Sequence, residues 1–299
     1  MQLRPIPFSA LIVVAALAAG CDVHVGENGV SLDVASGKAS DEWSRTYTVA
    51  SGGAVEIVNT NGAIVVEPST GAQVEVKATR QTRAPSDEEA QALLKNLEIK
   101  EEVSDGRVHL QTSTGTGMLF GRRSASVEYH LRVPAGLKVS VKTENGGIGM
   151  HDVNGSLSAS TTNGGIRGTN LSGSVSAHII NGGIVVDLAS VAGPIDLDAV
   201  NGGIRLDIPA DAKLDVEARA VNGGVNAEAG LALSGGERTR NGLSGKLNGG
   251  GTKVSATTVN GGVRIGSRSA TASGQKGTNG DVDLEVLEVD GNTVVVPKR

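Results

Sequence analysis

Apolar and polar residues alternate along most of the second half of the chain. Residues 157–161 (LSAST) and 195–199 (IDLDA) show the pattern clearly. A period of two predicts β-strands with apolar side chains on one face and polar side chains on the other. After each Asn-Gly-Gly the alternation resumes with its parity shifted by one, as in residues 184–188 (IVVDL). The tripeptide therefore predicts a corner, since Asn tolerates positive φ and Gly adopts it freely.

Asn-Gly-Gly followed by Ile or Val recurs along the chain every 18 to 21 residues or a multiple of that interval. Such a period predicts a solenoid in which each repeat stacks on its neighbour. In parallel coils the Asn side chains would lie about 4.8 Å apart and could form an amide ladder, a structural role that needs no ligand. The predicted ladder consists of Asn145, Asn163, Asn181, Asn201, Asn222 and Asn260, with weaker relatives at Asn61 and Asn241.

Asn-Gly is also a common hairpin turn, so an antiparallel meander is the structural alternative. A meander does not require the same tripeptide at one corner of every repeat and looser chemistry at the other. The sequence therefore favours an all-β fold, a parallel β-helix with about 18–21 residues per coil. Parallel crossovers are usually right-handed, which predicts a right-handed helix.

The region before residue 137 is less regular but still rich in predicted strands. A short helix is expected at about 86–97, because Ser86 begins a capping box and acidic residues fill the first turn. Ala90, Leu93, Leu94 and Leu97 form its apolar stripe. We expect this helix to close one end or side of the solenoid, where an open core would otherwise meet water.

Residues 1–20 have the features of a signal peptide, with one positive charge and a short apolar run before Cys21. Small residues before a cysteine resemble the bacterial lipobox, which implies a mature protein that starts at a lipidated Cys21. A cleaved ordinary signal followed by a free cysteine is the alternative. The predicted organisation is then a tether at 21–40 and a solenoid domain at 41–299, with regular coils at about 137–296. The expected location is the bacterial envelope, membrane-anchored and facing the periplasm or the exterior.

Composition supports a thin, elongated body. The chain has 43 Gly in 299 residues and only 2% aromatic residues, so a thick core is not expected. The formal net charge of −5 provides no basic excess for binding nucleic acid.

Candidate chemistry is sparse. The histidines show no metal-ligand spacing, and we predict no catalytic residue, no metal and no cofactor. Asp196 with Asp198, and Asp281 with Asp283, could serve a glycosidase or a calcium site. The same pairs are expected on any solvated strand face. The solenoid region also lacks the aromatic platforms that a polysaccharide-cleaving enzyme would use.

Two surfaces are candidates for interaction. Met118, Leu119 and Phe120 lie in a Gly-rich loop beside two arginines and could contact a membrane or a protein groove, or could plug the solenoid end. Residues 231–280 carry a basic excess, whereas residues 181–230 are acidic. This block predicts weak, salt-sensitive binding to an anionic envelope polymer or to lipid headgroups. Its candidate residues are Arg238, Arg240, Lys246, Lys253, Arg264 and Arg268.

Residues 133–139 (VPAGLKV) leading into 143–148 (TENGGI), and residues 247–254 leading into 258–265, resemble the bacterial "putative adhesin" family of β-strand repeat proteins. The resemblance implies a right-handed β-helix on an envelope or secreted protein, with no established catalytic residues. The predicted function is a non-enzymatic, adhesin-like binding or scaffold module. We expect the lipid to anchor it to a membrane. Its expected partner is an anionic envelope polymer, a lipid headgroup or a protein. The alternatives are an envelope-stress component that senses a peptide or lipid, and a polysaccharide-active enzyme.

Overall fold

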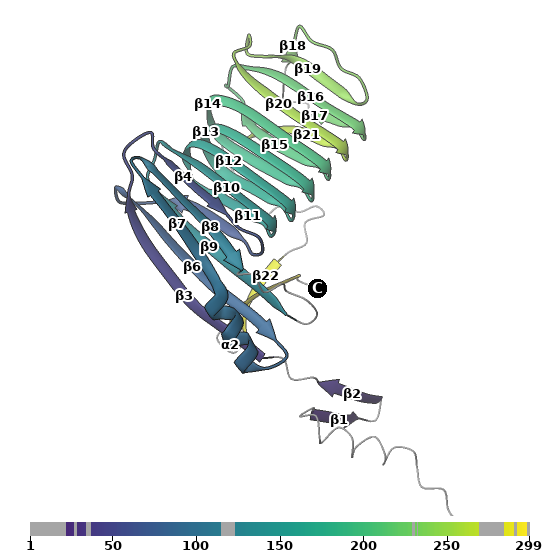
Figure 1. Ribbon diagram of the computed structural model, residues 1–299. Coiled ribbons are helices and arrows are strands. Elements are labelled where there is room, and N and C mark those ends of the chain that lie inside the picture. The colour runs from purple at the N-terminus through teal and green to yellow at the C-terminus, as the bar shows by residue number, and fades with distance from the viewer. Residues whose placement is uncertain are drawn as a thin grey trace, which may run out of the picture. The chain divides into compact units, whose positions relative to one another are not determined.

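A computed structural model describes residues 22–26, 29–33, 37–114, 123–228, 231, 233–268, 284–289 and 292–297. The chain divides into two units, Met1–Ser267 and Arg268–Arg299. In the first unit, β3 to β21 form one 19-stranded sheet (Figure 1). No helix among the described residues is long and apolar enough to cross a membrane.

The elements of the first half are β1 (Asp22–Gly26), β2 (Gly29–Asp33), β3 (Gly37–Thr48), β4 (Ala54–Val58), β5 (Ile64–Pro68), β6 (Gln73–Ala84), α2 (Asp87–Asn96), β7 (Leu97–Ser104), β8 (Arg107–Thr114), β9 (Ser124–Val133), β10 (Leu137–Asn145) and β11 (Ile148–His151). The elements of the second half are β12 (Asn154–Asn163), β13 (Ile166–Asn181), β14 (Ile184–Asn201), β15 (Ile204–Pro209), β16 (Leu214–Asn222), β17 (Val225–Ala227), β18 (Leu233–Ser234), β19 (Gly242–Leu247), β20 (Thr252–Asn260), β21 (Val263–Arg268), β22 (Leu284–Val289) and β23 (Asn292–Pro297).

The 19-stranded sheet bends at the Asn-Gly-Gly corners, and each side of the bend is a run of neighbouring strands. Layer A comprises β7, β8, β4, β10, β12, the second half of β13, the second half of β14, β20, β16 and β19, in that spatial order. Layer B comprises β3, β6, β9, β5, β11, the first halves of β13 and β14, β15, β21 and β17. From β4 to β16 in layer A every pairing is parallel, as the repeat pattern predicts.

The core lies between the two layers and consists mainly of aliphatic side chains from the inward positions of the alternating pattern. Val139, Leu157 and Val175 are register partners on neighbouring strands, and each is at most 2% exposed. Each strand stacks an aliphatic residue on that of the next, so the coils bury a continuous apolar column without needing large aromatic residues.

The coils do not stack in chain order, which differs from the simplest interpretation of the repeats. β20 lies between β14 and β16, pairing in parallel with both. The intervening strand β19 instead pairs antiparallel with β16 on its other side. Asn248, Gly249 and Gly250 all have positive φ at the turn between β19 and β20, where the chain reverses direction. The weak repeat at Asn241 therefore forms an antiparallel end strand rather than a coil of its own.

The region before residue 137 adds a further coil, because β4 and β5 pair in parallel with β10 and β11. Helix α2 starts at the expected capping residue, Ser86, whose Oγ accepts a hydrogen bond from the Glu89 amide at 3.3 Å. Ala90 is fully buried, and the helix packs against β3, β6 and β7 at this end of the stack (Figure 1). That the helix shields the end of the apolar core from water stays a prediction.

The ends of the predicted solenoid domain differ from expectation. β3 begins at Gly37 rather than at residue 41, and β1 pairs antiparallel with β2 within the expected tether. The described coils end with β21 at Arg268 and do not continue to about 296. Within the second unit, β22 and β23 instead form an antiparallel pair. In this short hairpin the two strands supply each other's backbone hydrogen bonds, so neither needs a parallel neighbour for them.

Candidate functional site

The Asn side chains form a continuous hydrogen-bonded ladder along the corner. The spatial order is Asn61, Asn145, Asn163, Asn181, Asn201, Asn260 and Asn222, and from Asn145 onward each Nδ2 donates to the Oδ1 of the preceding Asn at 2.8–2.9 Å. The Nδ2 of Asn61 ends the ladder by donating to the Ala125 carbonyl at 3.2 Å. Asn241 lies outside the ladder and accepts from Thr239 Oγ1 at 3.4 Å. These contacts serve the structure of the corner.

The two glycines of the corner have different roles. Gly182 has a φ of +142°, and a Cβ there would lie only 1.6 Å from the Gly164 carbonyl oxygen. At Gly183 a Cβ would meet nothing closer than the Gly203 oxygen, at 3.6 Å. Only the first glycine of this corner is therefore required by the backbone.

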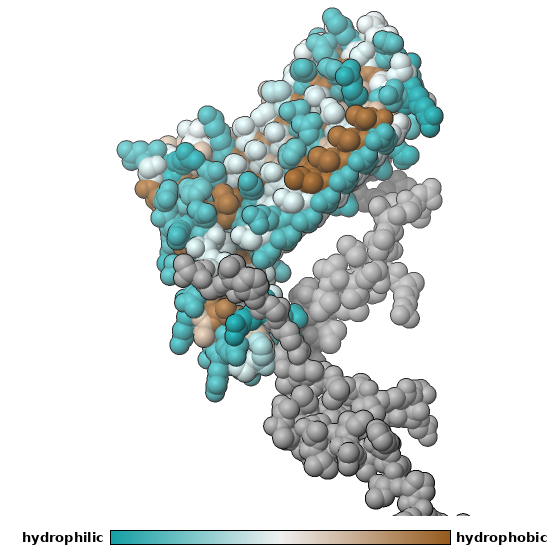
Figure 2. All heavy atoms as spheres, turned by 45° about the vertical axis from the view of Figure 1, so that its right-hand side comes forward, coloured by the Kyte–Doolittle hydropathy of each residue, from teal (hydrophilic) through white to brown (hydrophobic). Residues whose placement is uncertain are grey.

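An apolar row lies on the outer face, one position before the ladder. On four neighbouring rungs this position holds Ile180, Val200, Val259 and Val221. Ile180, Val221 and Val259 are 38%, 58% and 38% exposed. Figure 2 shows hydrophobic residues gathered in such a row on the solenoid surface. The repeat pattern did not predict this row, although an Ile or Val directly precedes Asn-Gly-Gly in these four repeats.

Three hollows on the outer face of layer A share residues and form an extended surface, here called the polar track. The first hollow has a volume of about 400 Å³ and crosses β12, β13, β14 and β20. The second has a volume of about 300 Å³ and crosses β20, β16 and β19. The third has a volume of about 560 Å³ and lies between β16 and the segment 237–244. Lys253 lines both the first and the second, whereas Glu217 and Ser244 line both the second and the third. The polar residues of the track are Ser156, Ser158, Ser174, Ser176, Asp196, Lys253, Ser255, Asp215, Lys246, Glu217, Ser244, Arg219, Glu237, Thr239 and Asn241.

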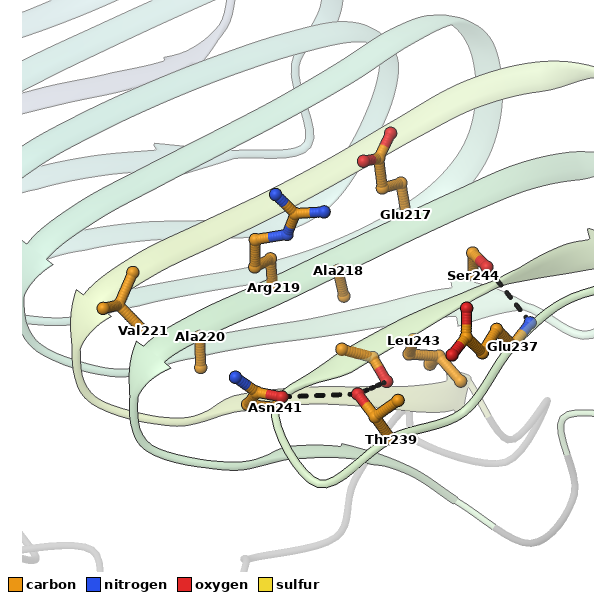
Figure 3. A pocket seen from close by; sticks show the side chains of 11 residues that line it. Glu217, Ala218, Arg219, Ala220, Val221, Glu237, Thr239, Asn241, Leu243 and Ser244 are labelled. Atoms are coloured by element: carbon orange, nitrogen blue, oxygen red, sulfur yellow. Dashed lines mark hydrogen bonds between the residues drawn. The ribbon is translucent and has the colours of Figure 1, made fainter.

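Figure 3 shows the end of the track formed by β16 and the segment 237–244. Glu217 and Arg219 project from β16 on the outward positions of the alternation. The opposite wall is held in place by the Glu237 amide, which donates to Ser244 Oγ at 3.1 Å, and by Thr239 Oγ1, which donates to the Gly242 carbonyl at 3.2 Å. One wall of the hollow is therefore held in place by hydrogen bonds within the segment 237–244.

Charges of both signs alternate along the track. Asp215 is the register partner of Lys246 on one side and of Lys253 on the other. Asp196 is exposed and is the partner of Ser255 on β20. The pKa of the neighbouring Asp198 is raised because burial disfavours its charged form and because the charge of Asp196 lies nearby, while His178 acts in the opposite direction. No group of three or more potential metal ligands occurs among the described residues.

The predicted basic block does not form one patch. Because β20 and β21 insert between coils of the acidic block, Lys253 lies among carboxylates on layer A, whereas Arg264 lies on layer B. Arg238 and Arg240 belong to the segment that leads into β19, Lys246 lies on β19, and Arg268 ends β21. The axial separation of charge inferred from the linear blocks is thus wrong for the described coils.

Several predicted site residues fall outside the described residues. These are Cys21, the apolar loop residues Met118, Leu119 and Phe120, and the acidic pair Asp281 and Asp283. Of the acidic pairs, Asp196 and Asp198 are described and share the outer face of β14.

Comparison with known proteins finds a family that is similar to part of the chain. Residues 138–266 match the family described as Toastrack DUF4097. Among solved structures, a "putative cell adhesion protein" from Clostridium sporogenes is similar with 14% identity over 76% of this chain and 100% of that chain, with a TM-score of 0.40. No curated protein matches the chain.

Two further structures cover comparable shares. A "putative adhesin" from Bacteroides fragilis shares 10% identity over 76% of this chain and 97% of its own, with a TM-score of 0.31. A "putative lipid binding protein" from Parabacteroides distasonis shares 11% identity over 77% and 97%, with a TM-score of 0.26. The match of residues 138–266 to the Toastrack DUF4097 family confirms the predicted resemblance to a known β-strand repeat family.

Proposed function

We propose that this chain is a non-enzymatic, adhesin-like binding or scaffold module of the bacterial envelope. The observation that supports this function is the polar track, in which three hollows share residues across six neighbouring strands. A surface of this length suits an extended ligand better than a small compact one. Its open shape and the serine and charged side chains along it suit broad contacts of modest strength rather than a few buried anchor residues.

The parallel ladders support a binding role because they fix the backbone positions from which the side chains of the first hollow project. Ser158, Ser176 and Asp196 are successive register partners, which places them about 4.8 Å apart on strands whose backbones are fully paired. A preorganised surface loses little conformational entropy when it binds. The right-handed sense of the coils belongs to the same proposal and follows from the preference of parallel crossovers.

Anchoring by a lipid at Cys21 is the second part of the proposal. The lipobox-like residues before Cys21 support it. Several acyl chains hold a protein stably on a membrane where a single chain does not. The anchor would keep the track at the envelope and would increase its effective concentration near a polymer ligand.

Retention of the full chain on envelope material tests this function. Cells producing the protein are extracted with detergent, and the fraction that stays with the insoluble cell wall is measured. Ser176→Arg, which obstructs the first hollow, should lower that fraction severalfold, whereas the matched layer B variant Thr169→Arg should not. Complete extraction of the unmodified protein, or equal retention of both variants, contradicts the proposal. Release of new reducing ends that Asp196→Asn and Asp198→Asn abolish would instead indicate the enzyme.

A further inference from the structure

We propose that the ligand of the polar track is a linear, uncharged polysaccharide that runs across the strands of layer A. This inference rests on the proposed binding function and deepens it by naming the class of ligand. Two observations support the inference. The coil order brings hydroxyl side chains together in the first hollow, and charges of both signs are mixed along the rest of the track.

The first hollow presents serine hydroxyl groups on β12, β13 and β20, with Asp196 of β14 between the last two strands. Ser156 and Ser174 are register partners, and so are Ser158 and Ser176. Ser255 on β20 continues the second row beyond Asp196. These serine side chains form no side-chain hydrogen bond with the described residues. Each hydroxyl can donate one hydrogen bond and accept others, which matches the hydroxyl groups of a sugar chain.

The spacing suits a repeating polymer. Rungs follow one another at about 4.8 Å, and hydroxyls two positions apart on a strand are separated by about 6.6 Å. A polymer lying across the strands meets a hydrogen-bonding side chain at every rung of the second row, which consists of Ser158, Ser176, Asp196 and Ser255. The Gly193–Pro194 segment of β14 borders the hollow, and a Cβ at Gly193 would lie 2.8 Å from Ser174 Cβ, so this segment packs closely against the first row.

An extended peptide fits this surface less well. Peptides that bind sheets commonly add a strand at an open edge, where unpaired backbone groups supply the hydrogen bonds. The track instead lies on the face of layer A, and β13, β14 and β20 are each paired on both sides there. Recognition on this face must therefore come from side chains.

The charges on the track oppose a strongly charged ligand of either sign. Lys253 and Lys246 flank Asp215, and Asp196 borders the same hollow as Lys253. A polyanion would meet Asp196, Asp215 and Glu217, whereas a polycation would meet the lysines. An uncharged glycan is repelled by neither the carboxylates nor the lysines. It can still accept hydrogen bonds from the lysines and donate hydrogen bonds to the carboxylates.

The experiment uses the full chain in detergent micelles and measures dissociation constants by titration calorimetry. The probes are three neutral linear glycans, namely mixed-linkage β-glucan, dextran and linear mannan, together with polygalacturonate and chitosan as the anionic and cationic polymers. The double variant Ser158→Ala with Ser176→Ala removes two hydroxyls of the first hollow. Thr169→Ala removes an exposed hydroxyl from layer B and is the matched control. Thermal unfolding verifies that both variants fold.

We expect at least one neutral glycan to bind, with an affinity that changes less than twofold between 0.1 and 0.5 M NaCl. The double serine variant should bind it about fivefold or more weakly, because two hydrogen bonds are lost, and the control should bind as the unmodified protein does. Binding confined to polygalacturonate or chitosan and lost in salt overturns the inference in favour of a charged ligand. Absence of binding to every glycan also overturns it. If track-dependent retention on cell walls persists in that case, the proposed function survives while the ligand class fails.

Discussion

Asn260 donates a hydrogen bond from Nδ2 to Oδ1 of Asn201 at 2.8 Å, although the two residues are 59 positions apart. Asn222, which lies between them in the chain, sits one rung further along and donates to Asn260 Oδ1, also at 2.8 Å. This arrangement places β20 between β14 and β16. It also brings Lys253 and Ser255 to the polar track.

Engineered disulfides test this coil order. In a Cys21→Ser background, Asp196→Cys with Ser255→Cys should cross-link readily under oxidising conditions, because the two positions are direct partners on neighbouring strands. Asp196→Cys with Glu217→Cys should not, since β20 separates their strands. Electrophoretic mobility without reductant measures both. The opposite outcome would mean that the coils stack in chain order.

The two corner glycines should respond differently to substitution. Gly182→Ala is expected to destabilise the fold by about 1–3 kcal/mol, because its φ is positive and its Cβ would collide with a carbonyl oxygen. Gly183→Ala should change the free energy of unfolding by less than about 0.5 kcal/mol. Denaturant titration of both variants measures the difference. Equal midpoints would refute the assigned corner geometry.

Ladder position should determine the effect of removing an Asn side chain. Asn163→Ala breaks two side-chain hydrogen bonds, whereas Asn222→Ala at the end of the ladder breaks one. At about 0.5–1.5 kcal/mol per bond, the interior variant should lose roughly twice as much stability. Asn241→Ala, outside the ladder, is the control for chemical denaturation. Identical losses at all three positions would show that the ladder contributes nothing.

Glu56 should make stability depend on pH. The Arg107 guanidinium and then His109 hold the pKa of Glu56 below its usual value. Its contribution is therefore fully present above the unfolded pKa of about 4.3 and is lost as the pH falls through the lowered folded value. Because Arg107 is 59% exposed, Glu56→Gln should cost only about 0.5–1 kcal/mol at pH 7. Unfolding curves of the two proteins should converge in acid; a gap that persists there would contradict this assignment.

Cys21→Ser tests the anchor. The unmodified protein should enter the detergent-rich phase of a phase separation and carry labelled fatty acid, since acyl chains add about 0.8 kcal/mol per buried methylene. The variant should remain uncleaved or soluble and unlabelled. Recovery of the unmodified protein in the aqueous phase without label would rule out lipidation and leave a free cysteine.

Local chemistry made much of the architecture predictable. Alternation predicted the strands, Asn-Gly-Gly predicted the corners, and the capping box at Ser86 predicted α2 to within a residue at each end. These signals concern neighbours within a few residues or one repeat, where side-chain periodicity and backbone preference act directly. The candidate binding surface was predictable only in fragments, since Lys253 and Asp196 were each singled out without any sign that they line the same hollow.

By itself, the sequence determined that this protein is a repeated β-fold with an Asn corner and an aliphatic interior. Each repeat contains the alternating apolar residues and the Asn-Gly corner that produce these features locally. The tertiary structure alone decided which coil lies beside which, and with it the polar track, the exposed row from Ile180 to Val221 and the mixing of the acidic and basic blocks. The physical reason is that near-identical coils can pair with one another in several orders. The order adopted depends on β19, which turns back against β16 and leaves β20 to fill the position beside β14.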